Sequence, residues 1–465
     1  MNKLLDAESD CEKATQLNSK YAKAWARLGA IRKNLGQWEP SLDAYNQALE
    51  LLPDSNLSQA DKNIQRECEL DIDYVKSKMK QKTTPSPILS ADHDLPWDRV
   101  LNLEEVVRER GRSGTYSSRW VLLEAAMDYN DGMRAMRMIQ KIVTPSGRPG
   151  YSGQLGAIRY LVKALITDHR AFRIEDPNGY PRLCNLQADF EAQHDKAIVR
   201  AGGAENIMTE VLKMKETESW DVLRPAINTT IRVFIFRAFN EGSVEREYAS
   251  ALETYRMVIE LIQRCQELWK DVSREERGEV FDAEFLRGVK CLKLDCYLMA
   301  HDSERFPLEG LYKDAQDLLH ELDALKDDEK FSPEKDPASY LAFYAYPRSQ
   351  ALTTLGLCYR KKAEALPTSS ETYPEDDELH CFYLAFAFDA LVKSGSARLT
   401  EVLDIAQKIK NTLPKMKVLW EKSAMSSMRD VTITQTLIAE EQLLTMQRSG
   451  RLKPTDTVSR EFFRR

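Results

Sequence analysis

The strongest constraint on the fold of this chain lies between residues 20 and 53, where two segments carry large and small apolar residues at helical spacing. In residues 20–35 these are Ala24, Trp25, Leu28 and Ile31. In residues 41–52 they are Leu42, Tyr45, Ala48, Leu49 and Leu52. Gly36 suits the left-handed end of the first helix, and Pro53 stops the second. The pattern predicts two antiparallel helices that pack closely.

A third helix is predicted over residues 58–81, with a charged outer face. Its apolar stripe consists of Ile64, Cys68, Ile72, Val75 and Met79. A terminal helix with one apolar face typically covers the last open face of a stacked array. Residues 83–97 then carry three prolines without helical periodicity and are predicted to be a linker.

Helical periodicity continues after this linker, so the predicted fold class is all-α. Long helices are expected near residues 97–112, 116–142, 153–170, 186–214, 219–240, 244–272, 276–300, 308–325, 337–365, 376–394, 399–411 and 415–448. The expected domains are a helical module at 1–82, a linker at 83–97, a larger helical region at 98–448 and a basic, weakly ordered tail at 449–465.

Residues 22–55 resemble a tetratricopeptide repeat through Trp25, Leu28, Gly29, Tyr45, Ala48 and Pro53. Arg32 departs from the aromatic residue usual at its place. Shifting back by the repeat's period places Ala7, Cys11 and Ala14 where a preceding second helix belongs. Weaker fragments with the same spacing recur near Ala351–Tyr359, Ala251–Val258 and Leu311–Leu318. They favour a continued array of helical hairpins over an unrelated helical bundle.

The run from Asp10 to Gly29 is similar to the last repeats of co-chaperone domains of the small glutamine-rich and Hsp-organising protein type. Those domains bind the acidic C-terminal tails of the seventy- and ninety-kilodalton heat-shock chaperones. The resemblance implies that Lys23 and Arg27, which share a helix face, hold tail carboxylates. Arg32, on the same stripe, is a lesser candidate.

The other three clamp residues of that family would precede Met1, so the resemblance implies an N-terminally truncated module. Truncation would expose an apolar edge formed by Leu4, Ala7, Cys11 and Ala14. Such an edge is expected either to associate with a second copy or to be covered by another part of the chain.

A formal net charge of −7 argues against nucleic acid as the main partner, because phosphate binding needs a basic surface. The eight scattered cysteines include no C-x-x-C pair and indicate reduced core thiols. The N-terminus lacks the apolar core of a signal peptide, and no apolar run is long enough to span a bilayer. A cytoplasmic protein with access to the nucleus is expected.

Motifs of catalysis are weak. The glycine-rich stretch 144–156 has no preceding strand signal and no Gly-Lys-Ser/Thr, which favours an inter-helix loop over a phosphate cradle. The six histidines are isolated, and no metal site, catalytic residue or cofactor is expected. The sequence therefore predicts a non-enzymatic adaptor that binds acidic peptide tails or partner proteins on a concave helical surface. The alternative is an enzyme or regulatory domain within 98–448 that the repeat module tethers to chaperones.

Overall fold

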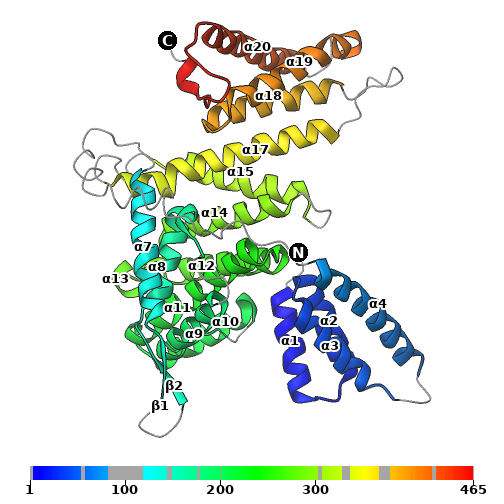
Figure 1. Ribbon diagram of the computed structural model, residues 1–465, viewed down its shortest axis with the longest axis vertical. Helices are drawn as coiled ribbons and strands as arrows, with labels where there is room; N and C mark the ends of the chain where they lie inside the picture. Colours follow the sequence, from blue (N-terminus) through cyan, green and yellow to red (C-terminus); the bar gives the residue numbers. More distant parts are fainter. Residues whose placement is uncertain are drawn as a thin grey trace. The chain divides into compact units, whose positions relative to one another are not determined.

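The computed structural model describes residues 4–53, 58–81, 119–143, 149–174, 179–199, 202–301, 306–326, 336–365, 377–420 and 426–463. Within them the chain is helical apart from one two-stranded antiparallel hairpin, which confirms the all-α prediction (Figure 1). The chain divides into two compact units, residues 1–299 with 333–339, and residues 300–332 with 340–465. The predicted linker at 83–97 and the predicted helix at 97–112 lie outside the described residues.

The first unit begins with four helices, drawn in blue in Figure 1, each packed on the one before it. They are α1 (Leu4–Leu17), α2 (Ala22–Leu35), α3 (Trp38–Glu50) and α4 (Gln59–Gln81). Tyr45 and Ala48 of α3 form a buried cluster with the predicted stripe of α4. Gly36 ends α2 with φ of 82°, the left-handed conformation expected of it. The apolar stripes of the sequence thus face one another as predicted.

A glycine brings α2 and α3 together. A Cβ atom added at Gly29 would lie 2.6 Å from the ring of Tyr45, and Ser41 Oγ donates to the Gly29 carbonyl over 2.8 Å. Two further hairpins share this arrangement, with Gly132 against Leu161 and Gly356 against Leu391. Close approach at a glycine therefore recurs in helix pairs far apart in the sequence.

The outer side of α1 is partly covered by α10 (Gly203–Thr217) and α12 (Tyr248–Leu268). Leu4 N donates to Glu253 Oε1 over 2.9 Å, and Lys13 Nζ donates to Asn206 Oδ1 over 3.1 Å. Ala7, Cys11 and Ala14 are half-buried. The contacts described with α10 fall on the side of α1 that carries Asp6, Ser9 and Lys13, rather than on the edge formed by Ala7, Cys11 and Ala14. What covers that edge stays a prediction.

The remainder of the first unit is built on a buried aromatic core. Phe172 contacts Tyr129 and Phe239 edge-to-face, with ring centroids 5.4 and 4.8 Å apart. The elements are α7 (Arg119–Arg137), β1 (Gln140–Val143), β2 (Pro149–Ser152), α8 (Ala157–Asp168), η1 (His169–Ala171), α9 (Tyr180–His194), α11 (Trp220–Phe239), η2 (Asn240–Val244), α13 (Arg274–Arg277), η3 (Glu279–Phe281) and α14 (Ala283–Ala300).

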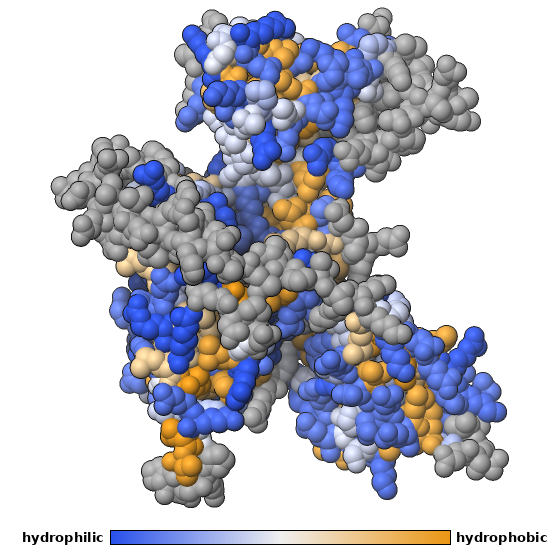
Figure 2. Space-filling view, in the orientation of Figure 1, coloured by the Kyte–Doolittle hydropathy of each residue, from blue (hydrophilic) through white to orange (hydrophobic). Residues whose placement is uncertain are grey.

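Two expectations for this region were wrong in detail. The helix expected over 116–142 ends at Arg137, and β1 and β2 form a hairpin where an inter-helix loop was expected. Its side chains Ile142 and Val143 are exposed, and Figure 2 shows hydrophobic surface at this hairpin. A third expectation also fails, because the helix expected over 186–214 is two helices. Helix α9 ends at His194, two residues before Lys196 with its φ of 56°, and α10 begins at Gly203, which has φ of +64° and lies against Asp6.

The second unit stacks α15, α17, α18, α19 and α20 in sequence order along one core. Its elements are α15 (Leu308–Ala324), α16 (Pro337–Tyr340, mostly assigned to the first unit), η5 (Leu341–Ala345), α17 (Tyr346–Ala365), α18 (Asp377–Ser394), α19 (Leu399–Trp420), α20 (Ser426–Arg448) and η6 (Arg460–Phe463). Helix α19 continues through Pro414, where a break was expected.

The segment after α20 differs from the weakly ordered tail expected from its composition. Leu452 and Val458 are buried in the core of the second unit. Val458 N donates to the Ala397 carbonyl over 2.9 Å, and Leu399 N donates to the Asp456 carbonyl over 2.8 Å. These contacts span about sixty residues, which is why local composition did not reveal them.

We expect Gly29→Ala to lower the opening free energy of the α2–α3 hairpin by about 1–2 kcal/mol. Overpacking costs about 1–3 kcal/mol, and the gain in helix propensity offsets up to about 1 kcal/mol. The Tyr45 ring cannot easily yield, since its hydroxyl is held by Asp71 over 2.5 Å. Amide hydrogen exchange in α2 and α3 measures the change, and Gln16→Ala on the exposed side of α1 should stay within about 0.5 kcal/mol.

Candidate functional site

Helix α2 presents Lys23 and Arg27 one turn apart on its exposed side, while Ala24 and Leu28 are buried on the other. Among the described residues neither cation forms a hydrogen bond or an ion pair. Arg27 acts on Cys11 of α1: burial raises the pKa of this thiol, and the nearby guanidinium opposes that rise. The two cations therefore stand on a fixed helix with their charged groups available to an anion.

The start of α2 is held in place by its neighbours. Trp25 Nε1 donates to the Ser19 carbonyl over 2.9 Å, and the backbone N–H of Ala24 donates to the Tyr21 carbonyl over 2.9 Å. Tyr21 is 45% exposed just before Lys23, so an apolar ring lies beside the cations. Such a ring could contact the side chains next to a bound carboxylate.

Arg32, the lesser candidate, is engaged inside the protein. Its Nε lies 3.1 Å from Glu8 Oε1 and its Nη2 lies 2.6 Å from Glu12 Oε1, both on α1. To hold a ligand it would have to give up both carboxylates. The signal for this role was present in the sequence, because an arginine replaces the usual aromatic residue where the preceding helix carries two glutamates four positions apart.

A second polar group ties α2, α3 and α4 together. Lys33 Nζ lies 2.6 Å from Asp71 Oδ1, and the Tyr45 hydroxyl donates to Asp71 Oδ2 over 2.5 Å. Burial, followed by the hydrogen bond to Asp71, raises the pKa of Tyr45 well above its usual range. Asp71 thus has a structural role in seating α4.

Residues 22–55 match the family model of the tetratricopeptide repeat. Repeats of this kind generally mediate contacts between proteins, and the packed pair of α2 and α3 lies within the matched segment. No curated protein matches the chain, and no solved structure matches it.

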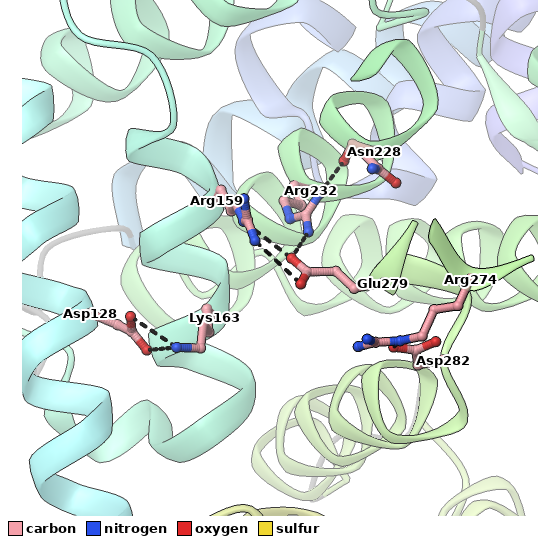
Figure 3. A network of polar contacts seen from close by, with 8 residues as sticks. All are labelled: Asp128, Arg159, Lys163, Asn228, Arg232, Arg274, Glu279 and Asp282. Carbon is pink, nitrogen blue, oxygen red and sulfur yellow. Dashed lines mark hydrogen bonds and ion pairs between the residues drawn. The ribbon is translucent and has the colours of Figure 1, made fainter. Parts of the chain in front are cut away.

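The larger helical region of the first unit contains a polar pocket of about 380 Å³ between α8, α9, α11 and η3. Arg232 is buried and its Nη2 lies 2.6 Å from Glu279 Oε1. Arg159 Nε reaches the same carboxylate over 3.2 Å, so two guanidiniums share one carboxylate (Figure 3). Burial lowers the pKa of Arg232 to about 10, although Glu279 acts against that shift.

Glu191 on α9 closes another side of the pocket. Its Oε1 accepts from Ile158 N over 3.1 Å, at the start of α8, and from Gln187 Nε2 over 2.7 Å. Burial raises the pKa of Glu191, and these hydrogen bonds oppose the rise. A carboxylate that accepts the first backbone N–H groups of a helix acts as its cap.

Thr229 and Asp195 also line this pocket, and His194 contacts Asp195 from outside the lining. Thr229 Oγ1 donates to Asp195 Oδ2 over 2.5 Å, and His194 Nδ1 lies 2.8 Å from Asp195 Oδ1. The aspartate stands between the other two, whereas an activated hydroxyl needs the imidazole beside it. The cations and carboxylates of the pocket compensate one another. Figure 3 also shows two ion pairs near this pocket, Lys163 with Asp128 and Arg274 with Asp282.

The contacts Thr229–Asp195, Arg232–Glu279 and Arg159–Glu279 join residues 34 to 120 positions apart, and no local pattern in the sequence predicts them. The part of the chain that the structure describes contains no group of three or more histidine, cysteine or acidic side chains placed to hold a metal ion. Within the same residues no helix is long and apolar enough to cross a membrane.

We expect Glu279→Gln to destabilise the first unit by about 1–3 kcal/mol, because it leaves buried Arg232 without a carboxylate. This destabilisation is smaller than that of breaking a fully buried ion pair, because the Glu279 side chain is 39% exposed and water screens its charge. Hydrogen exchange in α8 and α11 measures the loss. Glu267→Gln is the matched control: Glu267 is 83% exposed beside Lys270, and its substitution should change little. Equal effects of the two variants would contradict a structural role for the network.

Proposed function

We propose that this protein is a non-enzymatic adaptor whose repeat binds acidic C-terminal peptide tails, with Lys23 and Arg27 as the residues that contact carboxylates. The tails of the seventy- and ninety-kilodalton heat-shock chaperones are the partners that the co-chaperone-like sequence suggests. The observation that supports the proposal most directly is the pair of exposed cations on α2, for which no described residue supplies a carboxylate.

The energetics favour an anionic ligand at this place. Two like charges four residues apart on a helix repel by about 0.2–0.5 kcal/mol, and an anion between them reverses the sign. A charge-assisted hydrogen bond to arginine contributes about 1.5–3 kcal/mol. Because helix α2 is packed on both sides by α1 and α3, the cations need no folding step before they bind.

Arg32 plays a different part in this proposal. Since it already holds Glu8 and Glu12, it fixes α1 against α2 and thereby supports the surface that carries Lys23 and Arg27. Substituting it should therefore loosen the module first and change tail binding only through that loosening.

The alternative function, an enzyme or regulatory domain in the larger helical region, draws its support from the polar pocket of Figure 3. That pocket brings together Glu191 and Arg232, whose pKa values are shifted, as active sites often do. Each of these groups has a partner within the protein, and Asp195 separates the hydroxyl of Thr229 from the imidazole of His194. A structural network accounts for these contacts, so the adaptor is the function we favour.

Calorimetry with a C-terminal chaperone tail peptide tests the adaptor proposal. We expect the free-acid peptide to bind wild type, and we expect the amidated peptide to bind at least about tenfold more weakly, because one charge-assisted hydrogen bond contributes about 1.5–3 kcal/mol. The Lys23→Ala/Arg27→Ala variant should bind the free-acid peptide no more tightly than the amidated peptide.

The chain offers a matched control on the neighbouring helix. Lys62 and Arg66 of α4 are also exposed cations four residues apart, so Lys62→Ala/Arg66→Ala removes the same charge without touching α2. Equal losses in both double variants would mean that net charge drives the interaction, and no binding by wild type would overturn the proposal.

A further inference from the structure

A second hollow in the first unit has the opposite charge. It has a volume of about 470 Å³ and lies between the turn that joins α2 to α3 and the π-helical turn η2 with the start of α12. The described residues that line it include four glutamates and no lysine, arginine or histidine: Glu39, Glu241, Glu245 and Glu247. Trp38 and Met79 supply its apolar wall. This contrasts with the pocket of Figure 3, where arginines balance the carboxylates.

The π turn that contains Glu241, and that Glu245 follows, is held by contacts with the core of the unit. The Tyr180 hydroxyl lies 2.8 Å from Asn240 Oδ1, and a Cβ atom added at Gly242 would lie 2.9 Å from Cys296 Sγ. The backbone N–H of Glu247 donates to the Glu241 carbonyl over 2.7 Å. A π turn inside a helical segment often marks a functional place, and here it sets the direction of the acidic side chains.

The repeat contributes the other wall through Gly36. A Cβ atom added there would lie 2.5 Å from Glu247 Oε2, so the glycine leaves room for this carboxylate at the rim. The residue that ends α2 thus also brings the acidic turn close to Trp38. The Trp38 ring is held edge-on against Tyr74, with centroids 6.3 Å apart.

The carboxylate of Glu241 is the independent sign that something is bound here. Its Oε2 atom is buried and lines the hollow, and among the described residues it has no hydrogen-bond partner. Burial raises the pKa of Glu241 to about 7. The Ser250 hydroxyl and the charge of Arg237 oppose that rise, while the charges of Glu245 and Glu247 add to it. A buried carboxylate oxygen without a partner is unfavourable unless a donor reaches it.

The size of the hollow and its tryptophan wall favour an organic cation over a metal ion. The acidic side chains of the described residues are not grouped closely enough to hold a metal ion. A guanidinium or ammonium group is larger, donates several hydrogen bonds and is attracted to the face of a tryptophan ring. We propose that this hollow binds a lysine or arginine side chain from a basic peptide segment of a partner protein. The site differs in place and charge from the surface around Lys23 and Arg27 and does not depend on the function proposed for it.

Calorimetry on the full chain tests this with three capped tripeptides, glycine-arginine-glycine, glycine-lysine-glycine and glycine-citrulline-glycine. Citrulline keeps the shape of arginine and lacks its charge. We expect the two cationic peptides to bind at least about tenfold more tightly than the citrulline peptide, the discrimination that one charge-assisted hydrogen bond provides. Equal binding of all three peptides, or no binding of the cationic ones, overturns the proposal.

Glu241→Gln/Glu245→Gln should abolish that discrimination. Glutamine keeps the size of the side chains and removes like charges from the hollow, so the fold should be retained. The matched control is Glu67→Gln/Glu69→Gln on the exposed side of α4, which removes the same two negative charges and should leave binding unchanged. Unchanged binding in the first variant, or an equal loss in the control, also overturns the proposal.

Binding should tighten as pH rises from 6 to 8. Glu241, with its pKa near 7 in the empty site, must lose its proton before it pairs with the cation, so protons compete with the peptide below that pH. Glu241→Gln should remove this dependence. Besides the acidic lining, the titratable or charged groups that face Glu241 are Arg237 of α11, Tyr255 of α12 and Cys296 of α14. Burial raises the pKa values of Tyr255 and Cys296 far above this range, so they stay neutral.

Discussion

The close approach of paired helices at a glycine is the contact on which the rest of this structure depends. At Gly29, Gly132 and Gly356 the missing side chain admits a large neighbour from the next helix, so the two backbones lie nearer than two larger residues would allow. Close packing of this kind leaves little room for adjustment, because protein interiors are as dense as organic crystals. This close contact holds the two helices of each hairpin in a fixed position. It therefore also fixes the face of α2 that carries Lys23 and Arg27.

Charge is distributed unevenly over this rigid frame. In the interior of the larger helical region buried Arg232 pairs with Glu279. Two other places gather charge of one sign: the exposed cations Lys23 and Arg27 on α2, and the glutamates that line the hollow around Glu241. Like charges repel one another in the isolated protein, so both places are suited to ligands of opposite sign. One chain could in this way hold an acidic and a basic segment at once.

Much of the repeat was predictable from the sequence, because its information is local. The spacing of apolar residues located α2, α3 and α4, and Gly36 marked the turn between the first two. The helical class of the remainder followed from the same periodicity. The exposed positions of Lys23 and Arg27 also agree with the side of the helix expected for them, while their role as ligand contacts stays a prediction.

What the sequence did not reveal rests on contacts between distant residues. The start of α10 lies against α1 where Gly203 meets Asp6, and the order of the last segment depends on Val458 pairing with Ala397. Glu241 was overlooked because its significance lies in a π turn and in burial, neither of which has a periodic signature. Arg32 lies between these two cases. Its ion pairs join different helices, but its partners Glu8 and Glu12 could be recognised in the sequence as two glutamates four positions apart.

The cover that α10 and α12 place over α1 has a consequence for how the chain is made. The residues that meet there, such as Lys13 with Asn206 and Leu4 with Glu253, are separated by 193 and 249 positions. A ribosome that adds about 5–20 residues per second delivers the cover roughly ten seconds or more after α1 has emerged. During that interval the side of α1 that carries Asp6, Ser9 and Lys13 has no cover from α10 or α12. The first helices must therefore pack on one another before the rest of their surroundings has been made.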